Sequence, residues 1–291
     1  MAMPMLVSLH HVTRYAYDRP VSLGPQMIRL RPAPHARSRV AHYAMQVTPA
    51  HDERWQSDPH GNWVARCTFP ETTRAFSVTV DLQAELVAVN PFDFFVEPYA
   101  TAYPFALPSD LAHELTGYCD PEPAGTRLTA FLKDLPRGPV DTVPFLVDLN
   151  ARVQRTVRYI TRLEEGTLTP EETLADGAGS CRDSAWLLVQ VLRRLGIPVR
   201  FVSGYLIQLK PDVAPPAGDA PKEDVADLHA WAEVFLPGAG WIGFDATSGL
   251  LTAEGHIPLV AALHFRSAAP ITGTVGPAET KFSFEMSVAR V

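Results

Sequence analysis

Three residues in the C-terminal half, Cys181, His229 and Asp245, have the side-chain types that nucleophilic acyl transfer requires. Cys181 follows Gly179 and Ser180 and precedes a long apolar run, which predicts that its thiol lies on the first turn of a buried helix. The N–H groups and the dipole at a helix N-terminus favour the thiolate, which is the nucleophilic form of cysteine. The sequence therefore offers a candidate nucleophile.

The predicted partners of this thiol lie on a hairpin. His229 begins an alternating strand, Asp245 ends the next strand, and residues 237–240 form the turn between them. The hairpin brings both side chains to one place. A buried carboxylate needs a partner, and a neighbouring imidazole would in turn be held in one tautomer and stabilised as imidazolium. These residues are thus predicted to be nucleophile, base and orienting carboxylate.

Two other interpretations of the same residues remain open. One is a zinc site, but the three residues lack the short ligand pairs of typical zinc sites, so neither a metal nor a cofactor is expected. The other is a non-catalytic binding scaffold, in which Cys181 is an inert buried thiol and His229 a hydrogen-bonded core residue. Selective alkylation of Cys181 would distinguish an enzyme from such a scaffold.

The surrounding elements predict an α+β fold. Residues 5–90 form short alternating segments with polar turns, typical of an antiparallel β-sandwich in which Cys67 is a small core residue. Residues 91–140 are rich in proline, which excludes long helices from this connector. From residue 142 the apolar period becomes helical, and three strands follow residue 198.

Composition limits the classes of function. Of the 291 residues, 46% are hydrophobic, which is enough for a full core, and the net charge of −7 argues against nucleic-acid binding. Three cysteines without paired spacing predict a reducing, cytoplasmic setting. The first residues do not read as a signal peptide, and no apolar run is long enough to span a membrane. Neither nucleic acid nor a membrane is therefore an expected partner.

Four motifs carry a resemblance to a known family. In chain order they are GSCRDSA, GIPVRFVSGYL, HAWAEV and GWIGFDAT, within residues 179–247. Together they resemble the bacterial transglutaminase-like superfamily. The segments YAYDRPV and MIRLRP, within residues 15–32, more loosely resemble the N-terminal β domain of that family.

The resemblance implies a papain-like transglutaminase core preceded by the antiparallel β-sandwich domain. It assigns the nucleophile to Cys181, the base and acid to His229, and the orienting role to Asp245. It also implies acyl transfer through a thioester. We expect a sandwich with its connector at residues 1–135, a catalytic core at 136–268, and C-terminal strands at 269–291 that return to the β domain.

Four further residues are candidates for substrate contact or for support of the site: Asp183, Tyr205, Trp231 and Asp227. Asp183 is expected to cap the helix or to pair with Arg182 or Tyr205, and Tyr205 to border the pocket.

An oxyanion hole also needs two donors. The Cys181 N–H is one candidate, and the alternatives for the second are Gln154, Tyr159 and Trp231.

The expected activity is hydrolysis of a peptide, protein or small amide substrate. The alternative is transglutaminase-type transfer to an amine, which is less favoured because transfer needs a dry site that keeps water from the thioester. Asp227 and residues 255–259 resemble versions found at the front of very long bacterial proteins, so further C-terminal partner domains are an additional expectation. The substrate cannot be named from the sequence.

Overall fold

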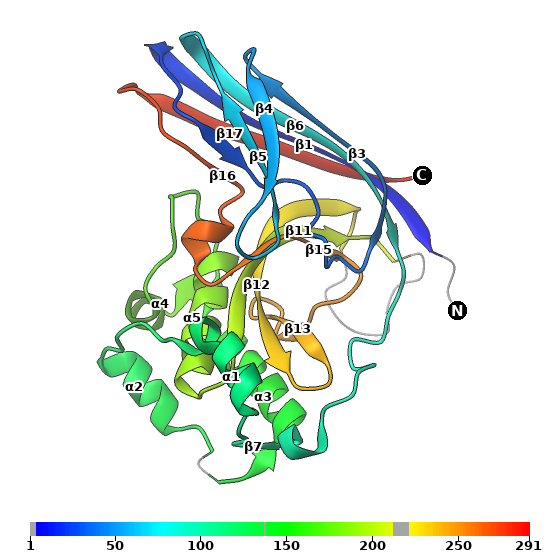
Figure 1. Ribbon diagram of the computed structural model, residues 1–291, viewed down its shortest axis with the longest axis vertical. Coiled ribbons are helices and arrows are strands. Elements are labelled where there is room, and N and C mark those ends of the chain that lie inside the picture. The colour runs from blue at the N-terminus through cyan, green and yellow to red at the C-terminus, as the bar shows by residue number, and fades with distance from the viewer. Residues whose placement is uncertain (1–3, 137, 212–220) are drawn as a thin grey trace.

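The computed structural model describes residues 4–136, 138–211 and 221–291, and two stacked antiparallel sheets form one end of it (Figure 1). The first sheet has the order β17-β1-β6-β3, formed by Thr280–Arg290, Met5–Val21, Thr73–Leu86 and Arg39–Thr48. The second has the order β16-β2-β5-β4, formed by Ile271–Thr272, Gln26–Ile28, Trp63–Thr68 and Asp52–Ser57.

Strand β6 shows why these segments form a sandwich. From Phe76 to Leu86 its side chains alternate between buried and half-buried, which is the period of a strand with one face in the core. The buried face belongs to the same apolar cluster as Ala65 and Cys67 of β5 in the opposite sheet. The expected β-sandwich is therefore present.

The C-terminal strand lies in the N-terminal sheet. β17 pairs antiparallel with β1 from Val7 opposite Arg290 to Tyr17 opposite Thr280, and Figure 1 shows the two strands side by side. The chain thus returns to its first strand after completing the core.

The other end of the molecule holds a five-stranded sheet with helices. The order is β14-β13-β12-β11-β15, formed by Leu250–Leu251, Gly240–Asp245, Val225–Leu236, Val199–Gln208 and His256–Ala262. The helices are α1 (Ser109–Glu114), α2 (Thr126–Lys133), α3 (Thr142–Thr156), α4 (Pro170–Asp176) and α5 (Cys181–Arg194). The short pairs β7–β8 (Ala102–Tyr103, Val140–Asp141) and β9–β10 (Arg158–Tyr159, Ala178–Gly179) complete this part, with 3-10 turns at Pro98–Ala100, Thr116–Cys119 and Phe265–Ala268. None of the helices in the described ranges is both long and apolar enough to cross a membrane.

Helix α5 is the centre of the core. Its side chains from Asp183 to Arg193 are all buried, and it packs on β11 and β12. It ends before Gly196, whose φ of +73° is the left-handed conformation that glycine adopts most readily after a helix. Because α5 is enclosed, its first residue is held in a fixed place.

The sandwich and the core share one packed interior. Asn62, 1% exposed, donates to the Ala261 carbonyl and accepts from the Ala261 N–H, both at 2.9 Å. His11 of β1 contacts the Tyr205 hydroxyl of β11 at 3.0 Å. Buried residues of both parts belong to one apolar cluster. These contacts hold the sandwich against the sheet that carries His229.

Candidate active site

Cys181 is the first residue of α5 and is half-buried. The preceding strand β10 pairs in parallel with β9, so that Gly179 lies beside Tyr159. A Cβ at Gly179 would lie 2.9 Å from Cβ of Asp183, which explains why glycine stands two residues before the thiol. The Cys181 N–H lies at the helix N-terminus, where backbone donors have no intrahelical acceptor.

Asp183 fixes this helix start. Its fully buried carboxylate accepts from the Ser180 N–H and hydroxyl, each at 2.8 Å, and from the Leu168 N–H at 2.7 Å. Arg162 donates to both carboxylate oxygens at 2.8 and 2.9 Å. Burial would raise the pKa of Asp183, but the bonds from Leu168, Ser180 and Arg162 outweigh it and lower that pKa.

The expected pairing of Asp183 with Arg182 or Tyr205 is therefore wrong, while the expected capping role is observed. Arg182 donates instead to the carbonyls of Arg162 and Glu164. Arg162, 20 residues earlier in the chain than Arg182, reaches the carboxylate because its loop passes over the helix start. Asp183 thus fixes the backbone next to Cys181, and its carboxylate is enclosed.

The structure brings Cys181, His229 and Asp245 together. His229 Nε2 of β12 lies 3.2 Å from Asp245 Oδ1 at the end of β13, and the His229 ring also interacts with the Cys181 thiol. Burial disfavours the imidazolium, but Asp245 and Cys181 outweigh it and raise the pKa of His229 to about 10. The imidazole thus lies between an anion and a thiol.

Asp245 has more partners than a single imidazole. The Thr247 N–H donates to its Oδ1 at 2.8 Å, and His256 Nε2 lies 3.5 Å from Oδ2. Burial would raise the pKa of Asp245, but His229 and His256 outweigh it and hold that pKa well below its ordinary value. The buried Asn150 also donates to the Asp245 backbone carbonyl at 3.2 Å. The carboxylate is thereby kept ionised and fixed.

His256 is the residue of this site to which the sequence assigned no role. Its Nδ1 accepts from the Ala253 N–H at 3.2 Å, so the proton of the neutral ring is on Nε2, which faces Asp245. His256 stands at the first position of β15, within the segment 255–259 that shares in the family resemblance, but nothing in its spacing predicts a contact with Asp245. We interpret His256 as a positioning residue for Asp245.

Trp231 supports the base. Its ring lies 6.4 Å from His229 at an interplanar angle of 30° and meets His256 edge-on at 5.3 Å. The indole N–H points to Glu233 Oε1 at 3.4 Å, and Glu233 forms a buried ion pair with Arg200 at 2.6 Å. The indole N–H is therefore directed away from the thiol, which argues against Trp231 as the second oxyanion donor.

Tyr159 and Asp227 lie at the rim of the site. Burial and then the Cys181 charge raise the pKa of Tyr159, whose ring is nevertheless 49% exposed. Asp227 precedes His229 by two residues on β12, so both point to the same face of the strand. Partial desolvation raises the pKa of Asp227, although the residue as a whole is exposed, and the Leu228 N–H and then the His229 charge partly offset this effect.

Tyr205 and Gln154 lie elsewhere. The Tyr205 side chain is fully buried, and its hydroxyl contacts His11 of the sandwich, so the expectation that Tyr205 borders the pocket is wrong. Successive side chains of β11 alternate, and Tyr205 falls on the face toward the sandwich. Gln154 is exposed on α3 and packs against Gly249. Of the three alternatives for the second oxyanion donor, Tyr159 is therefore the one that interacts with Cys181.

Two residues of the triad, together with His256, also form a set of possible metal ligands. The ligand atoms of His229, Asp245 and His256 lie within 4.8 Å of one another. Metal binding here would occupy the base and its carboxylate, and would thus compete with thiol chemistry.

Two regions of the chain match known families. Residues 130–246 match the transglutaminase-like superfamily, and residues 7–85 match the bacterial transglutaminase-like N-terminal region. Residues 130–246 of this chain are therefore similar to the transglutaminase-like superfamily. Both matches agree with the resemblance that the sequence motifs indicate.

Relatives match at different lengths. Uncharacterized protein Rv2569c of Mycobacterium tuberculosis is 27% identical over 276 residues, which cover 91% of this chain and 86% of the relative. A protein-glutamine gamma-glutamyltransferase of Pseudomonas aeruginosa is 37% identical over 90 residues, which are 28% of this chain and 13% of that protein. A solved structure of a candidate cysteine protease from Cytophaga hutchinsonii has a TM-score of 0.69 at 19% identity and covers 100% of this chain and 92% of its own. That structure shares the fold.

Proposed function

We propose that this protein is a cysteine-dependent amide or peptide hydrolase that acts through a thioester. The observation that carries the proposal is the buried His229 ring between the Asp245 carboxylate and the Cys181 thiol. A pKa of about 10 keeps this ring protonated at neutral pH, and an imidazolium beside a thiol favours a thiolate–imidazolium pair.

The proposed reaction has two halves. The Cys181 thiolate attacks the amide carbonyl, the oxyanion forms near the Cys181 N–H, and the imidazolium of His229 gives its proton to the leaving amine. The C–N bond breaks and a thioester remains. Water then attacks the thioester while His229 accepts its proton, and the carboxylic acid product leaves with regeneration of the thiolate. Asp245 keeps the imidazole oriented in both halves.

Transfer of the acyl group to an amine is the second candidate. The half-exposed Tyr159 shows that the rim is open to water, which favours hydrolysis. The carboxylate of Asp227 at the same rim would attract a cationic amine, which favours transfer. The glutamyltransferase relative supports this alternative, but it matches only residues that amount to 28% of this chain.

The decisive experiment screens amide and peptide substrates with wild type, Cys181→Ala and the matched control Cys119→Ala. We expect turnover by wild type and Cys119→Ala only, and an acyl adduct on Cys181 detectable by mass spectrometry after acid quench. Adding a primary amine distinguishes the two candidates, since transfer yields an amide product and hydrolysis an acid. Turnover by Cys181→Ala would remove this thiol as nucleophile, and an unreactive Cys181 would favour a binding scaffold.

The setting of the protein is part of the proposal. Cys67, Cys119 and Cys181 are all free thiols, which supports the expectation of a reducing cytoplasm. Cell fractionation with an antibody against the chain would test that location. A peptide, a protein or a small amide remains the proposed class of substrate.

A further inference from the structure

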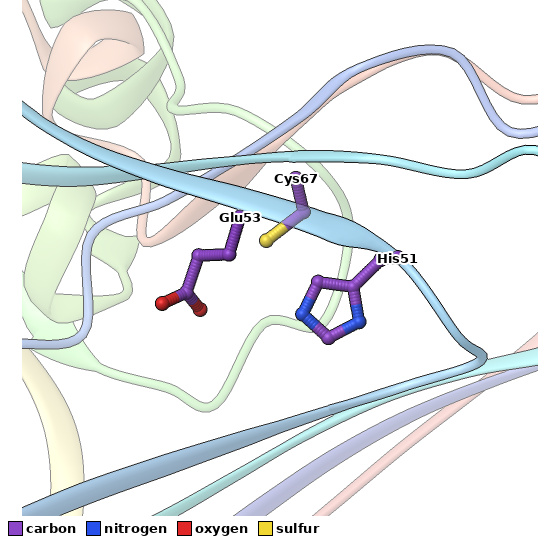
Figure 2. Close-up of side chains that lie close together, drawn as sticks. All are labelled: His51, Glu53 and Cys67. Carbon is purple, nitrogen blue, oxygen red and sulfur yellow. The ribbon is translucent and has the colours of Figure 1, made fainter.

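A second cluster of ligand-type side chains lies in the sandwich, away from the triad. Glu53 of β4 and Cys67 of β5 stand directly opposite each other in the antiparallel register, so their side chains point to the same face. His51 lies just before β4 and adds its ring to the same place, as Figure 2 shows. One ligand atom from each residue lies within 4.8 Å of the other two.

The His51 ring is oriented as a metal ligand would be. Its Nδ1 lies 2.9 Å from the Pro49 carbonyl oxygen, an acceptor that takes the Nδ1 proton. The neutral ring therefore presents the lone pair of Nε2, the nitrogen that Figure 2 shows turned toward Glu53 and Cys67. A carbonyl that fixes the non-ligating nitrogen is the usual arrangement around metal-bound histidine.

Glu53 is oriented in a similar way. The Trp55 indole N–H donates to Glu53 Oε1 at 2.7 Å, which fixes the carboxylate and leaves Oε2 able to take an ion. Glu53 also lines a surface hollow of about 580 Å³ with Arg31, Trp55 and Trp63, which gives an ion a path from solvent. The Cys67 sulfur is enclosed, since that residue is 0% exposed.

Charge and geometry both fit a divalent ion. A carboxylate and a thiolate neutralise a dication, so the filled site would place little net charge in the sandwich. Thiolate, imidazole and carboxylate are the donors that Zn²⁺ prefers, and its bonds of about 2.0 to 2.3 Å put ligand atoms about 3.5 Å apart. The ligand atoms of the three side chains would need to approach one another by about 1 Å. Small rotations of the half-buried His51 and Glu53 can provide this movement.

We propose that His51, Glu53 and Cys67 bind one Zn²⁺ ion, with water as the fourth ligand. On binding, the Cys67 S–H bond breaks, a Zn–S bond forms, and the proton leaves to solvent. The ion links the start of β4 to β5 and so stabilises the hairpin between residues 52 and 68. This site does not depend on the proposed hydrolase activity, because no residue of the triad takes part in it.

The test uses Co²⁺ as a spectroscopic probe in the full chain carrying Cys181→Ala and His229→Ala. These changes remove the thiol of the triad and one of the three possible metal ligands around Asp245. We expect one Co²⁺ per chain, with thiolate-to-cobalt charge-transfer absorption that disappears in a further Cys67→Ala variant. A further His51→Ala change should weaken Co²⁺ binding at least tenfold. Cys119→Ala and His42→Ala, a histidine that lines the same hollow, should leave binding unchanged.

Thermal unfolding supplies a second measurement. In the chain carrying Cys181→Ala and His229→Ala, Zn²⁺ should raise the melting temperature, as it should when His42→Ala is added, but not when His51→Ala is added. His51 is half-buried, so this variant keeps the test valid if Cys67→Ala does not fold. Absence of the charge-transfer band, its persistence in Cys67→Ala, or equal binding by His51→Ala would each overturn the proposal.

Discussion

Replacing Asp245 by asparagine removes the charge that keeps His229 protonated while preserving the shape of the side chain. The asparagine oxygen can still accept from the Thr247 N–H, so the turn after β13 should survive. The burial of His229, no longer opposed by this carboxylate, then disfavours the imidazolium. We expect the pKa of His229 to fall from about 10 toward or below its ordinary value of 6.5.

The size of the effect follows from the same shift. A difference between about 10 and 6.5 corresponds to roughly 5 kcal/mol at about 1.4 kcal/mol per pKa unit. No large discount for solvent applies, since His229 is 9% exposed, but Cys181 contributes part of the total. The share of Asp245 is therefore on the order of 3 to 4 kcal/mol, which predicts a loss of about 10² to 10³ in kcat/KM.

Two assays measure this prediction, and one of them needs no substrate. NMR titration of the His229 ring reports its pKa, and the rate of iodoacetamide alkylation of Cys181 between pH 5 and 9 (about the range in which imidazole and thiol groups titrate) reports the thiolate. The matched control is Asp227→Asn, an exposed carboxylate two residues before His229 that accepts from the Leu228 N–H. The reasoning is refuted if both variants alkylate at the wild-type rate, or if His229 in Asp245→Asn still titrates near 10.

Three other predictions follow from burial and charge. Near pH 7 iodoacetamide should modify Cys181 first, because burial raises the pKa of Cys67 to about 12 and also raises that of Cys119; peptide mapping that finds all three equally labelled would contradict this. His256→Ala should lower kcat about tenfold and move the acid limb of the rate profile to higher pH, with partial rescue by His256→Asn; an unchanged profile would leave His256 a purely structural residue. Burial lowers the pKa of His11 to about 4, so the contribution of the neutral His11 ring to the free energy of unfolding is complete above pH 6.5 and is lost as pH falls toward 4. The loss amounts to at most about 3 kcal/mol. Urea unfolding at both ends of that pH range should show the loss in wild type but not in His11→Gln.

Much of the core could be predicted because its signals are local. The cap at Thr169, the glycine at 196 and the apolar run after Cys181 place α4 and α5 within a residue or two of their observed ends. The alternation in residues 229–236 and the turn at 237–240 likewise give the end of β12 and the start of β13, whereas β12 begins four residues before the predicted strand, at Val225. Each of these features depends on residues only a few positions apart.

The parts that could not be predicted depend on long-range packing. The face of β11 on which Tyr205 lies is set by its contact with His11, 194 residues earlier in the chain. The arginine that reaches Asp183 is Arg162, because the loop between β9 and α4 folds over the start of α5. Neither contact leaves a periodic or spacing signal in the sequence, which therefore predicts neither the pairing of Asp183 with Arg162 nor the contact of Tyr205 with the sandwich.

The arrangement of histidines around Asp245 combines both kinds of information. The hairpin places His229 beside the carboxylate through local geometry. His256 belongs to β15, which pairs with β11 at the opposite edge of the sheet from β13. A carboxylate between two imidazoles stays ionised, and its position is fixed from two directions, so His229 meets a charge that does not move when the thiol loses its proton. The proposed reactive pair is thus oriented by an interaction that only the folded sheet creates, and the sequence motif around Cys181 does not by itself position the pair.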